Sequence, residues 1–419
     1  MFRSLRSRNY RLFFVGQLTS QVGNWTRRTG LTLLVLELTD NGVAVGLVTV
    51  AQFVPILVLG PWSGVVADRY DKRRLMFVAQ AVSMVSSFGL AVLAFLPEPS
   101  VVALYLVALG GGFAFAFDNP ARRSLVAELV PQVDITNAVS LNSALTTGGR
   151  IVGPAVAGLM VQTVGYGWCF VFDGVSYLAV LGALALMRQS EMRTGPRPPR
   201  ARGQAMAGLR YALDVPELRV SIAMVALVGT LAMNFPVVLP LFVTRSLGES
   251  EIAFTVLYST TSVGAVLGAL IGARRTAISV GDLVFAAAGF GVALVLLAAA
   301  PNLVVAYAVA VLLGLFSTVF MTAVSGMVQL SSTPSMRGRV ASLESILVVG
   351  SSPIGGPTVG AVCEYAGARA GLVVGGVACF GAALWGATAR RRQAGVPVGS
   401  VGSAGSAGSD PLVRAESDS

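Results

Sequence analysis

Apolar stretches of about 20 residues recur along nearly the whole chain, separated by short clusters of charged residues, prolines and glycines. A helix of that length crosses a hydrocarbon core of roughly 30 Å with every backbone hydrogen bond made internally. Of the 419 residues, 54% are hydrophobic and 12% are charged, whereas soluble domains carry about 25% charged residues. The sequence therefore predicts an all-α integral membrane protein with little room for a soluble domain.

The charged, proline, glycine and asparagine clusters divide the chain into twelve predicted transmembrane helices. They cover residues 12–38, 42–67, 75–96, 100–128, 136–163, 167–187, 219–244, 252–273, 281–299, 302–330, 340–364 and 370–389. The longest polar interval separates six helices from six. We therefore expect an N-terminal six-helix bundle over 1–187, a cytoplasmic linker over 188–218, a C-terminal six-helix bundle over 219–392 and a disordered tail over 393–419. Within the linker, residues 207–218 predict a short amphipathic helix on the membrane surface.

Basic residues are distributed unevenly between the two sides that these helices define. If the N-terminus is placed in the cytoplasm, most of the 30 Lys and Arg residues fall on the cytoplasmic side, where short loops are enriched in them. The formal charge of +10 therefore indicates membrane orientation rather than nucleic-acid binding. We expect a multi-pass protein of the cell membrane with both termini in the cytoplasm.

Several kinds of chemistry are excluded by composition. The chain contains no histidine, and the spacing of Cys169, Cys363 and Cys379 fits neither a disulfide framework nor a metal site. Ser-His-Asp catalysis, Cys-His catalysis and imidazole metal sites are therefore excluded. The sequence also contains no nucleotide-binding loop. We expect no enzyme activity, no catalytic residues, no metal, no cofactor and no direct use of ATP, and any proton carrier must be a carboxylate.

The two halves of the chain contain related sequence patterns. A shift of 202 positions aligns residues 138–158 with 340–360 and matches serines, leucines and glycines, and it also pairs Gly165 with Gly367. The shift equals the separation of the fifth and eleventh predicted helices. A repeat with the same orientation in both halves is typical of transporters built from two parallel six-helix bundles.

The stretch "GVVADRYDKRR", residues 64–74, places two aspartates and four basic residues between two apolar helices. It matches the loop signature of the major facilitator superfamily, Gly-x-x-x-Asp-Arg-x-Asp/Gly-Lys/Arg-Arg/Lys-Arg, at every defined position. The matching residues are Gly64, Asp68, Arg69, Asp71, Lys72, Arg73 and Arg74. In the corresponding loop of the second half, 268–281, Gly272 replaces the aspartate. The chain thus resembles this superfamily, which implies twelve helices in two pseudo-symmetric six-helix bundles.

Three further stretches, 9–25, 114–131 and 327–357, resemble the macrolide-efflux and enterobactin-exporter proteins, also described as transmembrane secretion effectors. The resemblance implies proton-coupled efflux of an amphiphilic small molecule, such as a drug or a macrolide-like or siderophore-like metabolite, by alternating access around a cavity between the halves. It implies an antiporter that contributes to antibiotic resistance and works as a monomer in the lipid bilayer, without nucleic acid. Solute uptake by the same fold and a membrane-embedded sensor are the alternatives.

The loop motif predicts a gate. Asp68 ends the second predicted helix, where it can face the N-terminus of the eleventh helix near Arg339. There the helix dipole and a cation both favour an anion. We expect this contact to latch the inner gate and to stabilise the outward-open state. Pairs of Arg69 or Arg74 with Asp71 would be exposed and would contribute under about 1 kcal/mol. A purely topological role explains the basic residues but not the ordered aspartates.

The stretch "GRIVGPAVAG", residues 149–158, partly matches the fifth-helix motif of superfamily antiporters. Ser140 and Ala157 stand where the motif has glycines, and the matching positions are Gly149, Gly153, Pro154 and Gly158. Small residues let helices approach closely, and Pro154 frees a backbone carbonyl. Simple helix packing explains the glycines about as well as antiport does. Arg150 lies within the span, and a charge there usually faces a cavity or a partner.

Polar residues inside the predicted helices form a candidate cavity or proton pathway: Gln17, Gln21, Asn24, Arg28, Asp118, Asp173 and Asn234. The four on the first helix share one face, because their spacing is i, i+4, i+7, i+11. That face predicts a cavity wall, with helix packing through hydrogen bonds as the alternative. Relatives often carry an acidic residue where Asn24 stands, so no proton-binding role passes to it.

Two carboxylates remain as candidate proton carriers. Asp118 is the first candidate and Asp173 the second, and structural ion pairing or capping is the alternative for both. The position of Asp118 near the inner surface fits gating as well as proton carriage. Proline pairs in 234–242 and 350–357 predict breaks in the seventh and eleventh helices that permit bending.

Overall fold

The computed structural model describes residues 3–192, 204–273, 278–333 and 336–394, and within these ranges the side chains of residues 61, 64, 65, 68, 204, 205, 273 and 392–394 fall outside the description. All regular structure in the described ranges is helical. Residues 395–419 of the predicted tail and 193–203 of the predicted linker fall outside these ranges, and the last helix, α15 (Ala368–Ala394), includes residues 393 and 394, where the tail was predicted to begin.

The first half of the chain forms six long helices. They are α1 (Arg8–Thr39), α2 (Gly42–Arg69), α3 (Lys72–Ala94), α4 (Val101–Glu128), α5 (Ile135–Thr163) and α6 (Tyr166–Leu186). Short polar side chains begin several of them: the Asn41 side chain accepts hydrogen bonds from the backbone of Val43 and Ala44, and Asp71 and Ser100 cap α3 and α4. These helices agree with the six predicted spans to within a few residues.

The second half forms the remaining helices. Two of its six membrane spans are each broken into two helices. The elements are α7 (Gln204–Asp214), α8 (Pro216–Leu231), α9 (Phe235–Leu241), a π-helical turn (Phe242–Ser246), α10 (Glu251–Ala273), α11 (Val280–Ala299), α12 (Leu303–Ser331), α13 (Arg337–Gly350), α14 (Ser352–Ala366) and α15 (Ala368–Ala394). The breaks lie between α8 and α9 and between α13 and α14, at the two proline-containing stretches, as predicted. Proline breaks a helix because it lacks an N–H donor and its ring clashes with the preceding turn.

Eleven segments of the described chain are long and apolar enough to cross a membrane. Helix α1 is not among them because polar side chains interrupt its apolar surface, yet it is 32 residues long and lies against α5 and α6. It therefore completes the predicted set of twelve. The protein is an all-α multi-pass membrane protein.

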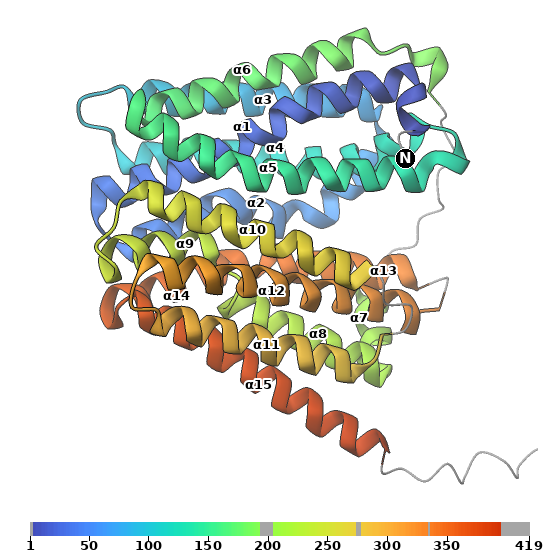
Figure 1. Ribbon diagram of the computed structural model, residues 1–419. Coiled ribbons are helices and arrows are strands. Elements are labelled where there is room, and N and C mark those ends of the chain that lie inside the picture. Colours follow the sequence, from blue (N-terminus) through green and yellow to red (C-terminus); the bar gives the residue numbers. More distant parts are fainter. Residues whose placement is uncertain (1–2, 193–203, 274–277, 334–335, 395–419) are drawn as a thin grey trace, which may run out of the picture.

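The helices of the two halves lie side by side in two bundles, and the N-terminus and α7 lie at the same end of the molecule (Figure 1). We call this the basic end, and the opposite end, where α1 leads into α2 at Asp40, the far end. The first half has an apolar core around Phe170 and Leu104. A second core, around Phe290 and Phe320, also includes Leu33, Leu36 and Val45 of the first half. The halves meet along α2 with α14 and along α5 with α10.

The internal repeat extends to backbone conformation. Gly165 lies between α5 and α6 with φ at 92°, and Gly367 lies between α14 and α15 with φ at 88°. Both values fall in the region that glycine adopts without steric cost. The two residues aligned by the sequence shift therefore make the same turn at the same place in each half.

The amphipathic helix expected in the linker is α7. It ends at Asp214 rather than continuing to residue 218, because Pro216 begins α8. The Tyr211 hydroxyl accepts a hydrogen bond from the Thr333 backbone at 3.1 Å, and Gly208 packs against the Arg339 side chain. Helix α7 thus docks on the basic end of the second half.

Candidate functional site

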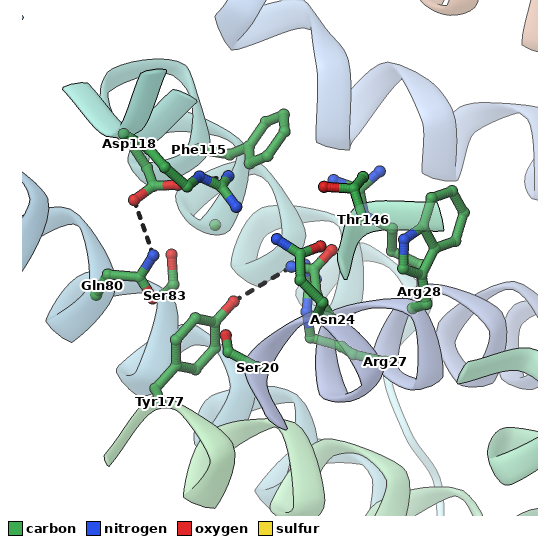
Figure 2. A pocket seen from close by; sticks show the side chains of 14 residues that line it. Ser20, Asn24, Arg27, Arg28, Gln80, Ser83, Phe115, Asp118, Thr146 and Tyr177 are labelled. Carbon is green, nitrogen blue, oxygen red and sulfur yellow. Dashed lines mark hydrogen bonds and ion pairs between the residues drawn. The ribbon is translucent and has the colours of Figure 1, made fainter. Parts of the chain in front are cut away.

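The polar face of α1 lines a cavity inside the first half (Figure 2). The cavity volume is about 120 Å³, which is smaller than the roughly 300–1,000 Å³ of typical small-molecule sites. The lining residues come from α1, α3, α4, α5 and α6: Ser20, Gln21, Asn24, Trp25, Arg27, Arg28, Gln80, Ser83, Gly111, Phe115, Asp118, Arg122, Thr146 and Tyr177. The expected cavity lay between the halves, whereas this one is enclosed by the first half.

Three of the four polar residues predicted on one face of α1 line the cavity directly: Gln21, Asn24 and Arg28. The Asn24 amide donates to the Tyr177 hydroxyl at 3.3 Å. Gln17 is buried beside them and accepts a hydrogen bond from the Gln21 side chain at 3.3 Å. The predicted stripe is therefore a cavity wall held by its own hydrogen bonds.

Asp118 lines the cavity and is paired. Its carboxylate lies 2.7 Å from the Arg122 guanidinium and accepts a hydrogen bond from the Gln80 amide at 2.8 Å, as Figure 2 shows for Gln80. Arg122 also donates to the Gln17 side chain at 3.3 Å. The preferred proton candidate is thus tied to a cation one helical turn away.

Asp173 is fully buried behind the cavity wall. Its Oδ2 lies 2.9 Å from Arg27 Nε and accepts a hydrogen bond from the Ser87 hydroxyl at 2.6 Å, while Oδ1 has no partner among the described residues. These contacts join α1, α3 and α6 at one point. Asp173 therefore has the geometry of a structural ion pair.

Arg28 has aromatic neighbours in place of a carboxylate. Its guanidinium carbon lies 5.5 Å from the ring centre of Trp25, 5.3 Å from that of Phe53 and 5.0 Å from that of Phe115. Its Nε is buried and has no hydrogen-bond acceptor among the described residues. Cation–π contacts of this kind compensate part of the cost of burying a cation.

The glycines of the antiporter-like stretch are packing positions. A side chain at Gly149 would collide with Gln21, one at Gly153 with Trp25, and one at Gly158 with Thr255 of α10. The first two allow α5 to contact α1, and the third allows it to contact the other half.

Pro154 exposes the backbone carbonyl of Arg150, because proline cannot donate the hydrogen bond that a helix normally supplies four residues back. The Ser262 hydroxyl of α10 lies 3.3 Å from that oxygen and 3.1 Å from the Tyr258 carbonyl, so the carbonyl freed by the proline takes part in a contact between the halves. The Arg150 Nε is buried without an acceptor among the described residues.

Asn234 does not reach the cavity. It is buried at the break between α8 and α9, where its side-chain amide donates to the Thr230 carbonyl at 2.6 Å and lies against Gly355. The residue therefore satisfies a backbone group near the end of α8 and permits close packing of the two broken spans.

The loop motif is anchored within the first half. Lys72 pairs with Glu128, and Arg73 donates to the carbonyls of Leu184 and Ala185 at 2.6 and 2.9 Å. Asp71 accepts hydrogen bonds from the backbone N–H of residue 74 at 3.1 Å and from the side chain of residue 189 at 2.9 Å. The motif therefore fixes the start of α3 to α4 and α6.

The other residues of the predicted gate make fewer described contacts. Arg69 and Arg74 are exposed. Gly64 and Asp68 lie in α2, and the surroundings of both side-chain positions fall outside the description. Arg339 is half-buried beneath α7, and its nearest side-chain partner is the Met336 sulfur at 3.3 Å. The contact between Asp68 and Arg339 stays a prediction.

A latch joins the halves at the far end. Arg245 of the second half binds the Asp40 carboxylate of the first half at 3.0 Å and Glu364 at 2.9 Å, and Glu364 accepts a hydrogen bond from the Gly42 backbone at 2.7 Å. We call these residues, Asp40, Gly42, Arg245 and Glu364, the far-end latch. Beside it, the Tyr166 hydroxyl donates to Glu251 at 2.7 Å.

Glycines bring the halves into backbone contact below this latch. A side chain on Gly42 would lie 2.6 Å from the Gly360 carbonyl, and one on Gly46 would collide with Gly356. The described hydrogen bonds between the halves lie at this end or in the middle of the spans. The far end is therefore closed by close packing and charge together.

Comparison with known protein families shows to which family this chain belongs. A family model described as transmembrane secretion effector matches residues 1–397. The chain belongs to this family of the major facilitator superfamily. The chain therefore belongs to a family of membrane transporters, and its helices have the architecture of that superfamily.

Curated relatives are similar to this chain over part of their length. The staphyloferrin A transporter of Staphylococcus aureus (strain NCTC 8325 / PS 47) is 34% identical over 178 residues, which cover 42% of this chain and 44% of the relative. The enterobactin exporter EntS of Shigella boydii serotype 18 (strain CDC 3083-94 / BS512) is 30% identical over 235 residues, covering 55% and 53%. The chain spans about half the length of the curated relatives it matches.

Solved structures of transporters share the fold of this chain. A POT family transporter in complex with 5-aminolevulinic acid has a TM-score of 0.75 at 10% identity and covers 92% of this chain and 96% of its own. A bacterial homolog of the human lysosomal transporter Spinster has a TM-score of 0.71 at 16% identity, with coverages of 93% and 98%. At these identities the likeness shows the fold alone.

Two features of the structure were not among the site residues predicted from the sequence. The far-end latch was missed because its members stand far apart in the chain. Glu344 of α13 was also missed: it is buried, it accepts a hydrogen bond from the Ser325 hydroxyl, and it forms no ion pair among the described residues. The signal was available, since Glu344 lies inside a predicted span and aligns with Asn142 in the repeat.

Proposed function

We propose that this membrane transporter exports an amphiphilic small molecule in exchange for protons, by alternating access between residues 1–187 and 219–392. The observation that carries the proposal is a charged cavity in a two-bundle transporter fold whose halves are held together at the far end. Closure at one end by contacts that can be broken is what a rocking mechanism requires.

The basic end is cytoplasmic in this proposal, which places the linker and both termini inside the cell. The far-end latch then closes the outer side, and the described conformation opens to the cytoplasm. In the opposite conformation the far-end latch separates and Asp68 contacts the start of α13 near Arg339. The helix dipole and the cation favour an anion at that point.

Glu344 is the carboxylate that we assign to the coupling proton. Asp118 and Asp173 both have arginine partners, whereas Glu344 has a hydroxyl partner within its own half. Arg123, on α4 of the other half, acts on it electrostatically without forming an ion pair. An ionised Glu344 attracts this cation and favours closure of the basic end, and a proton on Glu344 removes that attraction. Proton binding thereby favours one of the two conformations.

Relatives indicate which substrates to test first. The names of the matched proteins mention enterobactin and staphyloferrin A, and the wider resemblance includes macrolides. The polar cavity wall with aromatic residues fits a molecule with both polar and apolar parts. The transporter works as a monomer in this proposal, because the cavity is complete within one chain.

The experiment compares the wild type with Glu344→Gln in proteoliposomes. Enterobactin, staphyloferrin A and erythromycin serve as substrates, and transport is measured with a proton gradient and, separately, as exchange of substrate for substrate without one. We expect the variant to lose accumulation driven by the proton gradient and to retain exchange. Glu191→Gln, which removes an exposed carboxylate paired with Arg188, is the control and should retain both. Gradient-driven accumulation at the wild-type rate in Glu344→Gln would remove this residue from coupling.

A further inference from the structure

We propose that Arg28 binds the anionic group of the transported molecule, so that the substrate class is an amphiphilic anion. Such a molecule carries a carboxylate or a similar oxyanion on an apolar or aromatic body. The inference rests on the proposed function, since it names the chemistry of the molecule that the cavity receives.

The charges that line the cavity do not balance. Three arginines and one carboxylate form its wall. Arg122 is paired with Asp118 at 2.7 Å, and Arg27 is paired with Asp173 behind the wall at 2.9 Å. Arg28 is left over, with no carboxylate at ion-pair distance among the described residues. The cavity therefore carries one uncompensated positive charge.

The aromatic neighbours of Arg28 stabilise the cation but leave its Nε without a hydrogen-bond acceptor among the described residues. Trp25, Phe53 and Phe115 each lie within 6 Å of the guanidinium, at 5.5, 5.3 and 5.0 Å. Aromatic faces accept no conventional N–H···O bond, and the buried Arg28 Nε has no acceptor. Arg28 is half-buried, and a buried Nε without an acceptor is costly. A charge within a membrane span usually marks a ligand site or an ion path.

A bound oxyanion supplies what Arg28 lacks. The guanidinium presents N–H donors in a planar fork, and a carboxylate accepts two of them in parallel. Trp25 and Phe115 also line the cavity, so the apolar body of the same molecule can lie against their rings while its anionic group meets Arg28. The combination of one free cation with aromatic walls selects an amphiphilic anion over a cation or a neutral solute.

Arg150 adds positive charge on the same side. It lies on α5, its Nε is buried without an acceptor in the described part of the chain, and both it and Arg28 act electrostatically on Tyr258. The Trp25 and Tyr258 rings are 6.3 Å apart. The region around Arg28 is therefore positive on more than one helix, which increases the preference for an anion.

Trp25 provides a local reporter for the test. The chain has four tryptophans, and replacing Trp62, Trp168 and Trp385 with phenylalanine leaves Trp25 alone beside Arg28. In lipid nanodiscs, energy transfer from Trp25 reports binding of 1-anilinonaphthalene-8-sulfonate, an amphiphilic anion, and of N-phenyl-1-naphthylamine, its uncharged counterpart. The unlabelled substrate candidates should displace probe that is bound near Trp25. The part of the energy-transfer signal that they remove therefore reports binding at this site.

We expect the anionic probe to bind at least about tenfold more tightly than the neutral one, which corresponds to about 1.4 kcal/mol. Arg28→Gln should abolish that preference by weakening the anionic probe alone, and Arg28→Lys should keep part of it. The control is Arg369→Gln, which removes an arginine 6.0 Å from the Phe242 ring in the other half, outside the cavity. It should leave both affinities unchanged.

Three outcomes would overturn the anion site: equal affinity for the two probes in the wild type, an unchanged preference in Arg28→Gln, or equal loss of both probes in that variant. Displacement of the anionic probe by chloride, with gluconate at the same ionic strength without effect, would assign Arg28 to an inorganic ion and also overturn it. If substrate accumulates but the site binds the anionic and neutral probes equally well, the result counts against this inference alone. Charge-selective binding without any transport counts against the proposed function alone.

Discussion

Asp173→Asn tests whether the fully buried carboxylate of α6 is a structural partner or a proton carrier. In the wild type its Oδ2 lies 2.9 Å from Arg27 Nε and 2.6 Å from the Ser87 hydroxyl oxygen. The substitution leaves the Arg27 guanidinium, whose side chain is 9% exposed, without a counter-charge. Breaking a buried pair in this way costs about 3–5 kcal/mol.

Removing both charges separates the cost of the unpaired Arg27 charge from any other loss of stability that the substitution causes. Arg27→Gln together with Asp173→Asn leaves no unpaired charge, so the double variant should be more stable than the sum of the two single losses predicts. Asp134→Asn is the matched control, because its partner Arg3 is 3.8 Å away and 67% exposed. That substitution should cost under about 1 kcal/mol.

The assay is thermal unfolding of the purified variants in lipid nanodiscs, followed by proton-driven transport in proteoliposomes. The account predicts a strongly destabilised Asp173→Asn variant and a partly rescued double variant that still couples transport to protons. An Asp173→Asn variant as stable as the wild type would mean that the carboxyl group is neutral in the folded protein. A stable double variant without proton coupling would place the proton on Asp173, and either result would refute the structural role.

The remaining predictions concern the two gates. Asp68→Asn should insert into the membrane normally and lose most transport, because it removes the anion expected at the start of α13; transport at the wild-type rate would rule out the inner latch. Arg245→Gln should weaken the far-end latch. A cysteine placed at Thr49, a buried position between the halves, should then be labelled more extensively by an impermeant thiol reagent. Unchanged labelling would show that the latch does not hold this end closed. Gly158→Leu should have the same effect and lower transport, because its side chain would collide with α10, whereas Gly182→Leu, which faces open space, should do neither.

The fold could be predicted from the sequence because the membrane leaves few alternatives. Each span must be helical, so charged clusters and prolines determine where helices end. The fifth span, predicted over 136–163, is α5 over Ile135–Thr163. The breaks near Pro236 and Pro353 follow from the chemistry of proline alone. Local chemistry was therefore sufficient for element boundaries.

The cavity wall could be predicted only in part. The spacing of Gln21, Asn24 and Arg28 places them on one face of a helix, but spacing does not say which helices that face meets. The separation of Asp118 and Arg122 allows an ion pair, whereas nothing in the sequence places Asp173 beside Arg27. Long-range partners depend on how each helix is rotated in its bundle, and that is decided by packing of many side chains at once.

The far-end latch shows the same limit more clearly. Arg245 and Asp40 are 205 positions apart, and their contact requires both halves to be folded and docked. The same limit applies to Asn234. Its position within a span predicted a place in the cavity wall, but its side chain instead donates a hydrogen bond to a backbone carbonyl. Polar residues in spans therefore identify candidates, and packing decides their roles.

Transport into inverted membrane vesicles tests proton-driven export most directly. Enterobactin, staphyloferrin A and erythromycin are supplied outside vesicles whose interior is made acidic, and accumulation is followed before and after a protonophore collapses the gradient. The account predicts accumulation of at least one of these substrates that depends on the gradient and disappears with it. Accumulation that survives collapse of the gradient, or accumulation only in vesicles of the opposite orientation, would contradict it.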